Sequence, residues 1–268
     1  MKRNFSDLLK IIETYESKQP RYSPDRIPRA AQSVYEEAGN EVLKQATAIA
    51  RRSHESIREN QAEFTEIPGR AERTKQRLAI ANLVKPIEAH DLLKWAKQHQ
   101  LLINNDEFTR QWIRDGRKGE TENETYYDES SHRWIKRNNM FMHSTYLEFF
   151  HRLALHNYLF PEAPVRLEGF VVNDNELMPV FSQPHVQADR GATLAEVVKY
   201  MSRMGFKQKR GPDFYNPNTG VLVEDLHDEN VLVSPDGHLY IVDPVIFLDD
   251  EGKSHRLAAY SDLSELDV

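Results

Sequence analysis

The last third of the chain contains short, very apolar runs within the stretch VLVEDLHDENVLVSPDGHLYIVDPVIF, Val221 to Phe247. These runs are rich in Val, Leu and Ile, which favour β-strands, and they end at acidic or amide residues. The Pro-Asp-Gly sequence at 235–237 is typical of a tight turn, so the residues on either side of it are predicted to form a β-hairpin. The strand ends then carry Asp225, Asn230 and Asp243.

The spacing of these three residues is Asp-x4-Asn-x12-Asp. Because a hairpin brings the two ends of its strands together, Asn230 and Asp243 are expected to be neighbours, with Asp225 on the preceding loop. Such oxygen-bearing side chains suit Mg²⁺ or Mn²⁺, which bind through carboxylates, water and phosphate oxygens. The alternative is a purely structural role, in which the residues of this loop cap strands and keep a sheet edge soluble. A carboxylate between Val242 and Pro244 argues against it, because its desolvation is costly unless it is paired or coordinated.

Composition excludes several classes of site. The chain has 268 residues, a net charge of −7 and no cysteine. The length suits one large or two small domains, and the acidic balance does not favour nucleic acid as the main partner. Disulfides, zinc–thiolate sites and cysteine nucleophiles are excluded. No run approaches the length of a membrane span and the amino-terminal segment lacks the apolar core of a signal peptide, so we expect a cytoplasmic protein, with a secreted effector as the alternative.

Residues 1–105 are predicted to form a helical region, interpreted as a bundle or an arm. Apolar residues recur at helical spacing after Ser6, from Ala30 to about Glu63 and from Gln76 to Val84, where Pro86 is predicted to end the helix before another begins. Nucleic-acid binding by this region is the alternative, although glutamates interrupt its basic residues. Those residues are Arg51, Arg52, Arg58, Arg70, Arg73, Lys75 and Arg77.

From about residue 106 the pattern changes to short strands and single helices. The predicted elements are strands around 126–127 and 134–135, a helix within 142–160, a hairpin of 167–172 and 177–181, and a helix opened by Thr193 and Glu196 in capping-box spacing. The hairpin of the opening stretch follows. This order predicts an α+β fold rather than a doubly wound sheet.

The Asp-x4-Asn-x12-Asp spacing resembles the catalytic core of protein-kinase-like enzymes. EDLHDENVL is similar to the GDLHxxN loop of aminoglycoside and choline kinases, and IVDP to the metal-binding Asp segment of that superfamily. The layout also resembles kinase-like domains in the polyvalent proteins of phages and mobile elements. Over roughly residues 107–250, the resemblance implies a minimal bilobal kinase-like fold in 106–268. Its N-lobe would be about 106–182, its hinge about 182–186, and its reduced C-lobe about 187–268.

The resemblance also implies roles for residues. Asp225 would orient the attacking hydroxyl and accept its proton, while Asn230 and Asp243 would hold metal ions that bridge the phosphates of ATP. RWIK resembles the third-strand lysine segment, so Lys136 would contact the α- and β-phosphates. Glu148, the only acid in the following helix, would pair with that lysine.

Contacts to the rest of the nucleotide are implied less directly. Gly116 and Gly119 would open a phosphate-covering loop, although no G-x-G-x-x-G is present. MPVFSQPHV would be the hinge, with Phe181 and Gln183 beside the adenine. His227 is interpreted as a structural hydrogen-bonding residue, with metal ligation as the alternative.

Structural alternatives exist for other residues of the resemblance. Lys136 would then be one of several surface cations near Arg133 and Arg137, and Glu148 an ordinary exposed helix residue. The aromatic residues nearby are interpreted as core rather than as a stacking platform. They are Tyr126, Tyr127, Trp134, Phe149 and Phe150.

The sequence departs from the kinase pattern at three places. Val223 stands where protein kinases have a histidine, and Asp-Pro-Val ending at Val245 replaces Asp-Phe-Gly. Only 25 residues follow Asp243, too few for a full activation segment and a large peptide-binding lobe. We therefore interpret the chain as a metal-dependent phosphotransferase that uses ATP and Mg²⁺ or Mn²⁺, with a protein or a small molecule as acceptor.

Three other functions remain open. The first is a pseudokinase that binds nucleotide or serves as a scaffold, and the second is nucleotidyl transfer on the same fold. The third is a metal-dependent hydrolase that uses Asp225, His227 and Asp243 without a nucleotide.

Overall fold

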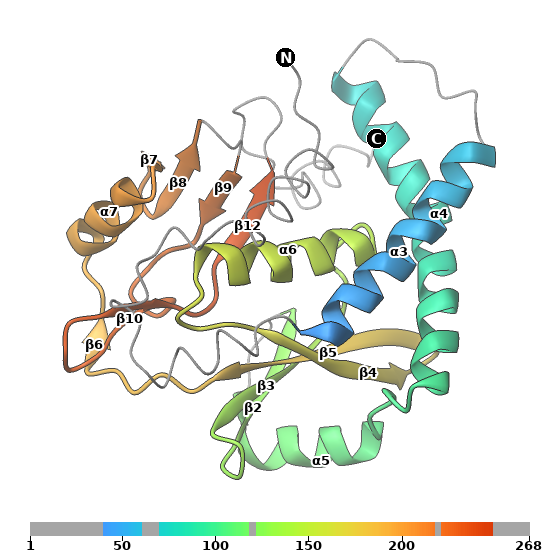
Figure 1. Cartoon of the computed structure of the whole chain (residues 1–268), viewed down its shortest axis with the longest axis horizontal. Coiled ribbons are helices and arrows are strands. Elements are labelled where there is room, and N and C mark those ends of the chain that lie inside the picture. Colours follow the sequence, from blue (N-terminus) through green and yellow to red (C-terminus); the bar gives the residue numbers. More distant parts are fainter. Residues whose placement is uncertain (1–39, 61–69, 118–121, 218–220, 249–268) are drawn as a thin grey trace, which may run out of the picture. The chain divides into compact units, whose positions relative to one another are not determined.

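The computed structural model describes residues 40–60, 70–117, 122–217 and 221–248 (Figure 1). Two predicted features lie outside these ranges: the helix after Ser6, and Gly119 of the phosphate-covering loop. The chain divides into two compact units. We call Ala38–Ala154 with Val165–His185 the sheet unit, and the described residues of Leu155–Pro164 with Val186–Val268 the hairpin unit.

The sheet unit contains a five-stranded antiparallel sheet in the order β1-β2-β3-β5-β4. Its strands are β1 (Gly116–Arg117), β2 (Asn123–Asp128), β3 (Arg133–Asn138), β4 (Arg166–Asn173) and β5 (Glu176–Pro184). Its helices are α3 (Glu41–Asn60), α4 (Arg70–Gln98), α5 (Asn105–Asp115) and the first part of α6 (Tyr146–Leu159). The predicted hairpin of 167–172 and 177–181 is confirmed as β4 and β5, and the strands predicted around 126–127 and 134–135 are confirmed as β2 and β3.

Turn chemistry explains why these hairpins form where they do. Asp174 and Asn175 have φ angles of 48° and 66°, the left-handed conformation that Asn and Asp adopt more readily than most residues. In the turn before β3, the carboxylate of Asp128 accepts bonds from the hydroxyls of Ser130 and Ser131. The register of both hairpins is therefore set by residues at their tips.

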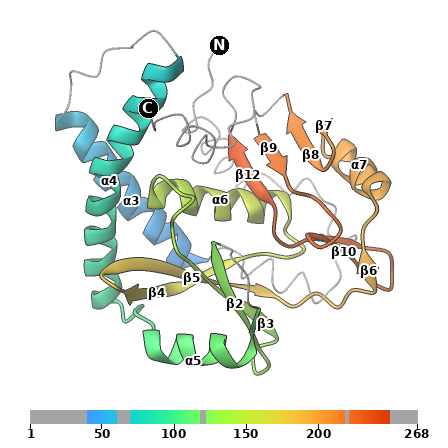
Figure 2. The ribbon, with the colours of Figure 1, turned by 180° about the vertical axis from the view of Figure 1, so that it is seen from behind.

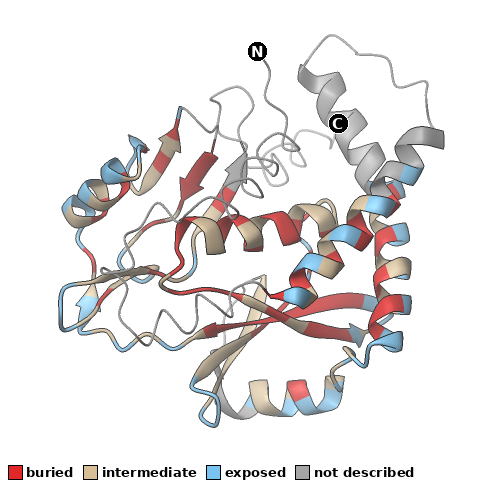
Figure 3. Cartoon of the chain, viewed as in Figure 1, coloured by how far each residue is buried: buried red, intermediate tan, exposed pale blue. Residues whose placement is uncertain are grey.

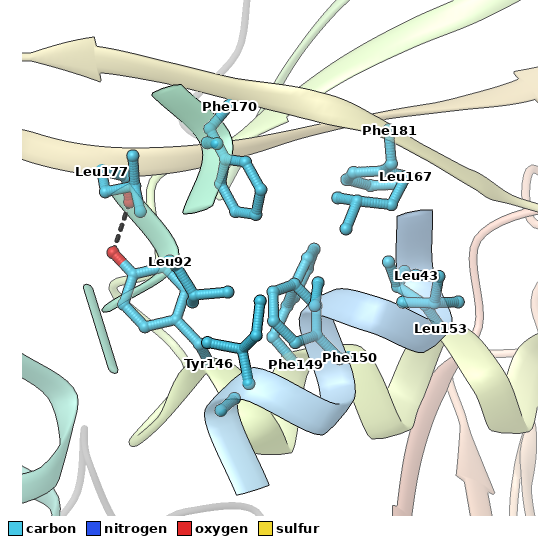
Figure 4. Packing of buried hydrophobic residues seen from close by; sticks show 14 of the residues in the cluster. Leu43, Leu92, Tyr146, Phe149, Phe150, Leu153, Leu167, Phe170, Leu177 and Phe181 are labelled. Carbon is cyan, nitrogen blue, oxygen red and sulfur yellow. Dashed lines mark hydrogen bonds between the residues drawn. The ribbon is translucent and has the colours of Figure 1, made fainter. Parts of the chain in front are cut away.

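Helices α5 and α6 cover opposite faces of this sheet (Figures 1 and 2). On the face toward α6, Phe170 and Phe181 pack with Phe149 and Phe150 in the largest core of the unit, to which α3 and α4 also contribute (Figure 4). On the other face, Phe108 of α5 packs with residues of β4 and β5. Phe149 and Phe150 are core residues, as the sequence predicts.

The prediction that Pro86 ends a helix is wrong. Helix α4 runs through Pro86 to Gln98 as a single element, and Figures 1 and 2 both show it bending along its length. A proline inside a helix removes one backbone hydrogen bond and pushes the preceding turn away, which bends the helix. Apolar residues before and after the proline, Val84 and Leu92, are completely buried, and this burial opposes a break.

The hairpin unit is built from short strands and one complete helix. Its strands are β6 (Arg190–Gly191), β7 (Lys207–Arg210), β8 (Asp213–Asn216), β9 (Val221–Glu224), β10 (Val231–Val233), β11 (Leu239–Ile241) and β12 (Val245–Leu248). They form a sheet in the order β11-β10-β6 and a second in the order β12-β9-β8-β7. Helix α7 (Leu194–Arg203) begins with the predicted capping box, in which Thr193 and Glu196 satisfy each other's backbone N–H groups.

Two features of this part of the chain differ from the sequence-based expectation. β5 continues through Pro184 and pairs with β3 there, so the first residues of the predicted hinge at 182–186 are strand. Ser182 pairs with Ile135 of β3 and with Arg166 of β4, and it is completely buried, so its backbone groups find their partners in the sheet rather than in water. The β7–β8 hairpin and β12 were not predicted, because their sequences are short and, in β7, entirely polar.

The predicted separation of residues 1–105 from 106–268 stays a prediction. The structure places the described helices α3 and α4 in the same compact unit as the five-stranded sheet. Buried residues are concentrated on β4, β5 and α6 in Figure 3, where the helices and the sheet meet.

Candidate functional site

Two strand ladders bring Asp225, Asn230 and Asp243 to one region of the hairpin unit. In the first ladder, β10 pairs with β11, and the N–H of Val242 donates to the carbonyl of Asn230 at 2.9 Å. In the second, β9 pairs with β12 so that Glu224 lies opposite Val245. Asp243 follows Val242 in the first ladder and lies two residues before β12 in the second, so both ladders fix its place beside the loop that starts at Asp225.

The backbone of Asp225 has an uncommon conformation, with a φ angle of 68°. Its N–H donates to the carboxylate of Asp213 at 3.3 Å, and its carbonyl accepts from the side-chain amide of Asn230 at 2.9 Å. The same amide nitrogen lies 3.4 Å from Oδ2 of Asp225. Left-handed residues outside glycine are costly and are retained where the surroundings hold them, which is common in functional loops. The side chain of Asp225 is nevertheless 48 % exposed.

His227 contacts residues at both ends of this loop. Its Nδ1 accepts from the N–H of Glu229 at 3.2 Å, and its Nε2 lies 3.6 Å from Oδ1 of Asp225 and 3.2 Å from Nδ2 of Asn230. With Nδ1 as an acceptor, a proton on Nε2 faces the carboxylate, while the amide nitrogen of Asn230 is itself a donor and does not bond to Nε2. The contacts to Glu229 and Asp225 support the structural interpretation of His227.

The donor set of this region fits a hard divalent cation. Because the amide nitrogen of Asn230 is used on Asp225, its Oδ1 is the atom that remains for a cation. Asp243 is exposed, so the prediction that its desolvation is too costly for a strand-capping role is wrong, and that alternative stays open. Asp243 follows Val242, whose N–H donates to the carbonyl of Asn230, and its carboxylate is the second oxygen donor of the set. Within the described ranges no group of three or more His, Asp or Glu residues has the geometry of a metal site. Two protein oxygens with water and phosphate completing the shell are what Mg²⁺ commonly takes.

Val223, in place of the kinase histidine, has a structural explanation. It lies in the middle of β9, is completely buried and pairs with Phe214 and Ile246.

Asp236 is confirmed as a turn residue, since its carboxylate accepts from the hydroxyl of Ser234 and from the N–H of His238.

Lys136 lies in the sheet unit on β3, the central strand of the sheet. It pairs with Thr125 and Phe181, and its Nζ lies 5.9 Å from the centre of the Phe181 ring. Lys136 is only 6 % exposed, so the alternative of an ordinary surface cation is wrong. An ammonium group buried to this degree is uncommon outside paired or functional positions.

The neighbouring Arg137 belongs to the opposite face of the sheet. It lies over the ring of Phe108, binds Glu124 and donates to Asn105. Because side chains alternate along a strand, Lys136 points to the face covered by α6, where Phe181 contacts Phe149.

Glu148 lies in the first turn of α6, one residue before Phe149. Its Oε2 accepts from the N–H of Ser144 at 3.1 Å, and its Oε1 accepts from Nη2 of Arg152 at 2.9 Å. Glu148 therefore has structural partners, and its pairing with Lys136 stays a prediction.

Two charged residues of α4 next to this turn were missed by sequence reasoning. Glu88 is completely buried and accepts from the N–H groups of Tyr146 and Leu147 at 2.8 and 3.3 Å. Burial raises the pKa of Glu88 to about 7, against the lowering effect of these two hydrogen bonds. Lys85 donates to the carbonyls of Met140 and His143, and burial lowers its pKa. No local pattern could have identified these residues, since their partners lie more than fifty positions away.

The predicted nucleotide contacts are placed as follows. Gly116 lies in β1 opposite Tyr126, while Gly119 lies outside the described residues. Phe181 and Gln183 are buried on β5, on the same face as Lys136. Their contacts to adenine stay predictions.

The same face carries an aromatic group that the sequence analysis assigned to the core. Tyr127 and Trp134 are only half-buried, with ring centres 5.2 Å apart. The indole N–H of Trp134 donates to Nδ1 of His185 at 3.1 Å. The assignment of these two residues to the core is therefore wrong.

Comparisons with known proteins complete the description of the site. A family model described as serine/threonine/tyrosine kinase found in polyvalent proteins matches residues 85–250. No curated protein and no solved structure matches the chain. In the part of the chain that the structure describes, none of the helices combines the length and hydropathy needed to cross a membrane.

Proposed function

The chain belongs to the family of serine/threonine/tyrosine kinases found in polyvalent proteins, and from this premise we propose that it is a metal-dependent phosphotransferase that uses ATP. The observation that carries the proposal is the convergence of Asp225, Asn230 and Asp243 through two independent strand ladders. Phosphoryl transfer asks a protein mainly for positioning and charge neutralisation, and these residue types supply both.

In the proposed reaction, the hairpin unit carries the acceptor chemistry. Asp225 accepts the proton of a hydroxyl whose oxygen forms a bond to the γ-phosphorus of ATP, while the bond from that phosphorus to the β–γ bridging oxygen breaks and ADP leaves. Oδ1 of Asn230 and the carboxylate of Asp243 hold Mg²⁺ or Mn²⁺. The cation neutralises charge on the phosphate oxygens when it is bound.

The sheet unit carries the nucleotide side of the proposal. Lys136 binds the α- and β-phosphates. Its burial favours such a binding role, because an ammonium group removed from water is costly unless a negative charge lies next to it. Glu148 orients that ammonium group. The acceptor is a protein or a small molecule, and the exposed Asp225 is compatible with either.

Two variants test the assignment. We expect Lys136→Ala and Asp225→Asn to abolish transfer of radiolabel from Mg-ATP, measured as autophosphorylation and with added acceptor proteins, while circular dichroism remains that of the parent. Intact mass of the incubated chain distinguishes a phosphate adduct from an AMP adduct and so tests nucleotidyl transfer. If both variants label as strongly as the parent, the site assignment is wrong.

One observation favours a second candidate, a pseudokinase that binds nucleotide without transferring phosphate. The carboxylate of Glu148 is bound by Arg152 and by a backbone N–H, which compete with a pairing to Lys136. Calorimetric titration with Mg-ATP followed by a long incubation with radiolabelled ATP separates the two candidates. Binding without transfer supports the pseudokinase, and transfer excludes it.

A further inference from the structure

A single turn of α4 contacts both the loop before α6 and the first turn of α6. Nζ of Lys85 donates to the carbonyls of Met140 and His143 at 2.7 and 2.9 Å, and Glu88, three residues later, accepts from the N–H groups at the start of α6. Residues three apart lie on the same side of a helix, so the two side chains act on one place.

The connection between β3 and α6 also needs these contacts. Met140 has a φ angle of 60°, which is costly for a residue of this size, and it is almost completely buried. Its N–H donates to the side chain of Asn138 at 2.7 Å, while its carbonyl accepts from Lys85. The buried residue Met140 is thus held through the peptide groups on both of its sides.

Side chains bind three N–H groups at the start of α6. The N–H groups of the first turn of a helix lack backbone partners within it. Those of Tyr146 and Leu147 donate to Glu88, and that of Glu148 donates to the hydroxyl of Thr145 at 3.1 Å, while the N–H of Phe149 makes the first backbone bond of the helix, to the carbonyl of Thr145. Glu88, a residue of a different helix, therefore binds two of the three.

A third contact fixes the same turn to the sheet. The hydroxyl of Tyr146 donates to the carbonyl of Leu177 on β5, as Figure 4 shows. The first turn of α6 is therefore held by α4 on its backbone and by β5 through a side chain.

We propose that Glu88 and Lys85 are positioning residues for phosphoryl transfer, because they fix the first turn of α6 and with it the carboxylate of Glu148. This inference rests on the proposed function. Glu148 lies in the turn whose N–H groups Glu88 accepts, so loss of those bonds moves or frays the part of α6 that carries it. Misplacement of a positioning group by about 1 Å is enough to slow an enzyme about 100-fold.

The charge on Glu88 provides a readout that a purely structural contact lacks. The ionised carboxylate accepts both N–H groups strongly, whereas protonation removes the negative charge and makes the hydroxyl oxygen a weaker acceptor for the N–H that it faces. With its pKa raised to about 7, Glu88 changes charge where activity is ordinarily measured. Other charged or titratable groups face this place from α4, α6, β5 and the preceding loop. They are Lys85, Tyr146, Glu148, Arg152, Glu176 and His143.

The experiment compares Glu88→Gln with a matched control in the full chain. Asp91→Asn is the control, because Asp91 lies on the same helix but accepts from Ser53 of α3 and has no part in the start of α6. Thr145→Ala is a second variant. It removes the hydroxyl that accepts from the N–H of Glu148 and so weakens the same turn without a change in α4. Each protein is assayed with Mg-ATP for kcat and KM between pH 6 and 9, and for amide hydrogen exchange in 144–149.

For Glu88→Gln we expect kcat to fall about 10-fold with little change in KM for ATP, and exchange in 144–149 to accelerate. Thr145→Ala changes kcat and exchange in the same direction, and Asp91→Asn changes neither. The parent's kcat rises through a pKa near 7 that Glu88→Gln lacks.

The outcomes separate this inference from the proposed function. An active parent with unchanged kcat in Glu88→Gln, or an equal loss in Asp91→Asn, overturns the positioning role and leaves the phosphotransferase in place. A parent that transfers no phosphate overturns both. If Glu88→Gln does not fold, Thr145→Ala decides, and normal kcat with faster exchange in 144–149 overturns the inference.

Discussion

The two units hold their charged candidate residues in opposite ways. In the hairpin unit, Asp225 is half-buried and Asp243 is exposed, both at strand ends, and residues close in sequence set their geometry. In the sheet unit, Lys136 and Glu88 are buried, and their geometry depends on elements far away in sequence. Exposed charges cost little in folding and are available to ligands, whereas buried charges are tied to the stability of the fold. Substitutions of exposed residues in the hairpin unit should therefore lower activity alone, whereas substitutions of buried residues in the sheet unit should change stability as well.

The largest effect is expected for Asp243→Asn in the hairpin unit. We expect it to reduce phosphate transfer at least about 1000-fold, because a cation ligand next to the phosphates loses its charge. Asp243 is exposed, so the free energy of unfolding in urea should stay within about 0.5 kcal/mol of the parent. Asp236→Asn in the turn of the same hairpin is the control and should keep full activity. A large loss of stability in Asp243→Asn would contradict the view that charged residues of the hairpin unit contribute little to folding.

The converse is expected for Phe150→Ala in the sheet unit. Phe150 is completely buried between Phe149 and Phe170, so its truncation should lower the free energy of unfolding by about 3–5 kcal/mol. The control is Phe141→Ala, which removes the same ring where it is 69 % exposed and should cost less than about 0.5 kcal/mol. Equal effects in urea unfolding would show that the core is wrongly placed.

Glu88 should link stability to pH. Its pKa is about 7 in the folded chain and near its ordinary value of 4.5 in the unfolded chain. Between these values the folded state holds a proton that the unfolded state has released, so the free energy of unfolding falls as pH rises, by at most about 1.4 kcal/mol per pH unit. Unfolding at pH 5, 6 and 8 should show this decline in the parent and a weaker one in Glu88→Gln. Parallel curves for the two proteins would be evidence against it.

The smallest effect is expected at the start of α7 in the hairpin unit. Thr193→Ala removes the hydroxyl that accepts from the N–H of Glu196, a contact worth about 1 kcal/mol in helix caps. Ser202→Ala, in an exposed position of the same helix, is the control and should be close to neutral. Thermal unfolding measures the stability of both variants. Both should keep the activity of the parent, and a loss of activity in either would contradict the assignment of α7 to a structural role.

The sequence was most informative where structure is local. The hairpin around 235–237, the spacing of Asp225, Asn230 and Asp243, and the capping box at Thr193 all depend on residues within about twenty positions. Turn residues, strand patterns and cap motifs act over that range, so their meaning is readable before the fold is known. The family resemblance and the α+β fold, which rest on the same local motifs, are confirmed.

The sequence was least informative about the helical region. Local preference disfavours proline within helices and so predicts a helix end at Pro86, yet burial of Val84 and Leu92 keeps α4 continuous. Thr145 and Glu148 stand in capping-box spacing, and the hydroxyl of Thr145 accepts from the N–H of Glu148, so this pattern marks the start of α6 in the sequence.

By itself, the sequence determined the strand ends of the hairpin unit and the chemical types that meet there, because short-range turn geometry allows few alternatives. Only the tertiary structure decided that Lys136 is buried and faces α6, and that α4 brings Lys85 and Glu88 to the start of that helix. Contacts over such separations come from the packing of several elements around one core, and no local pattern encodes which buried charge meets which helix end.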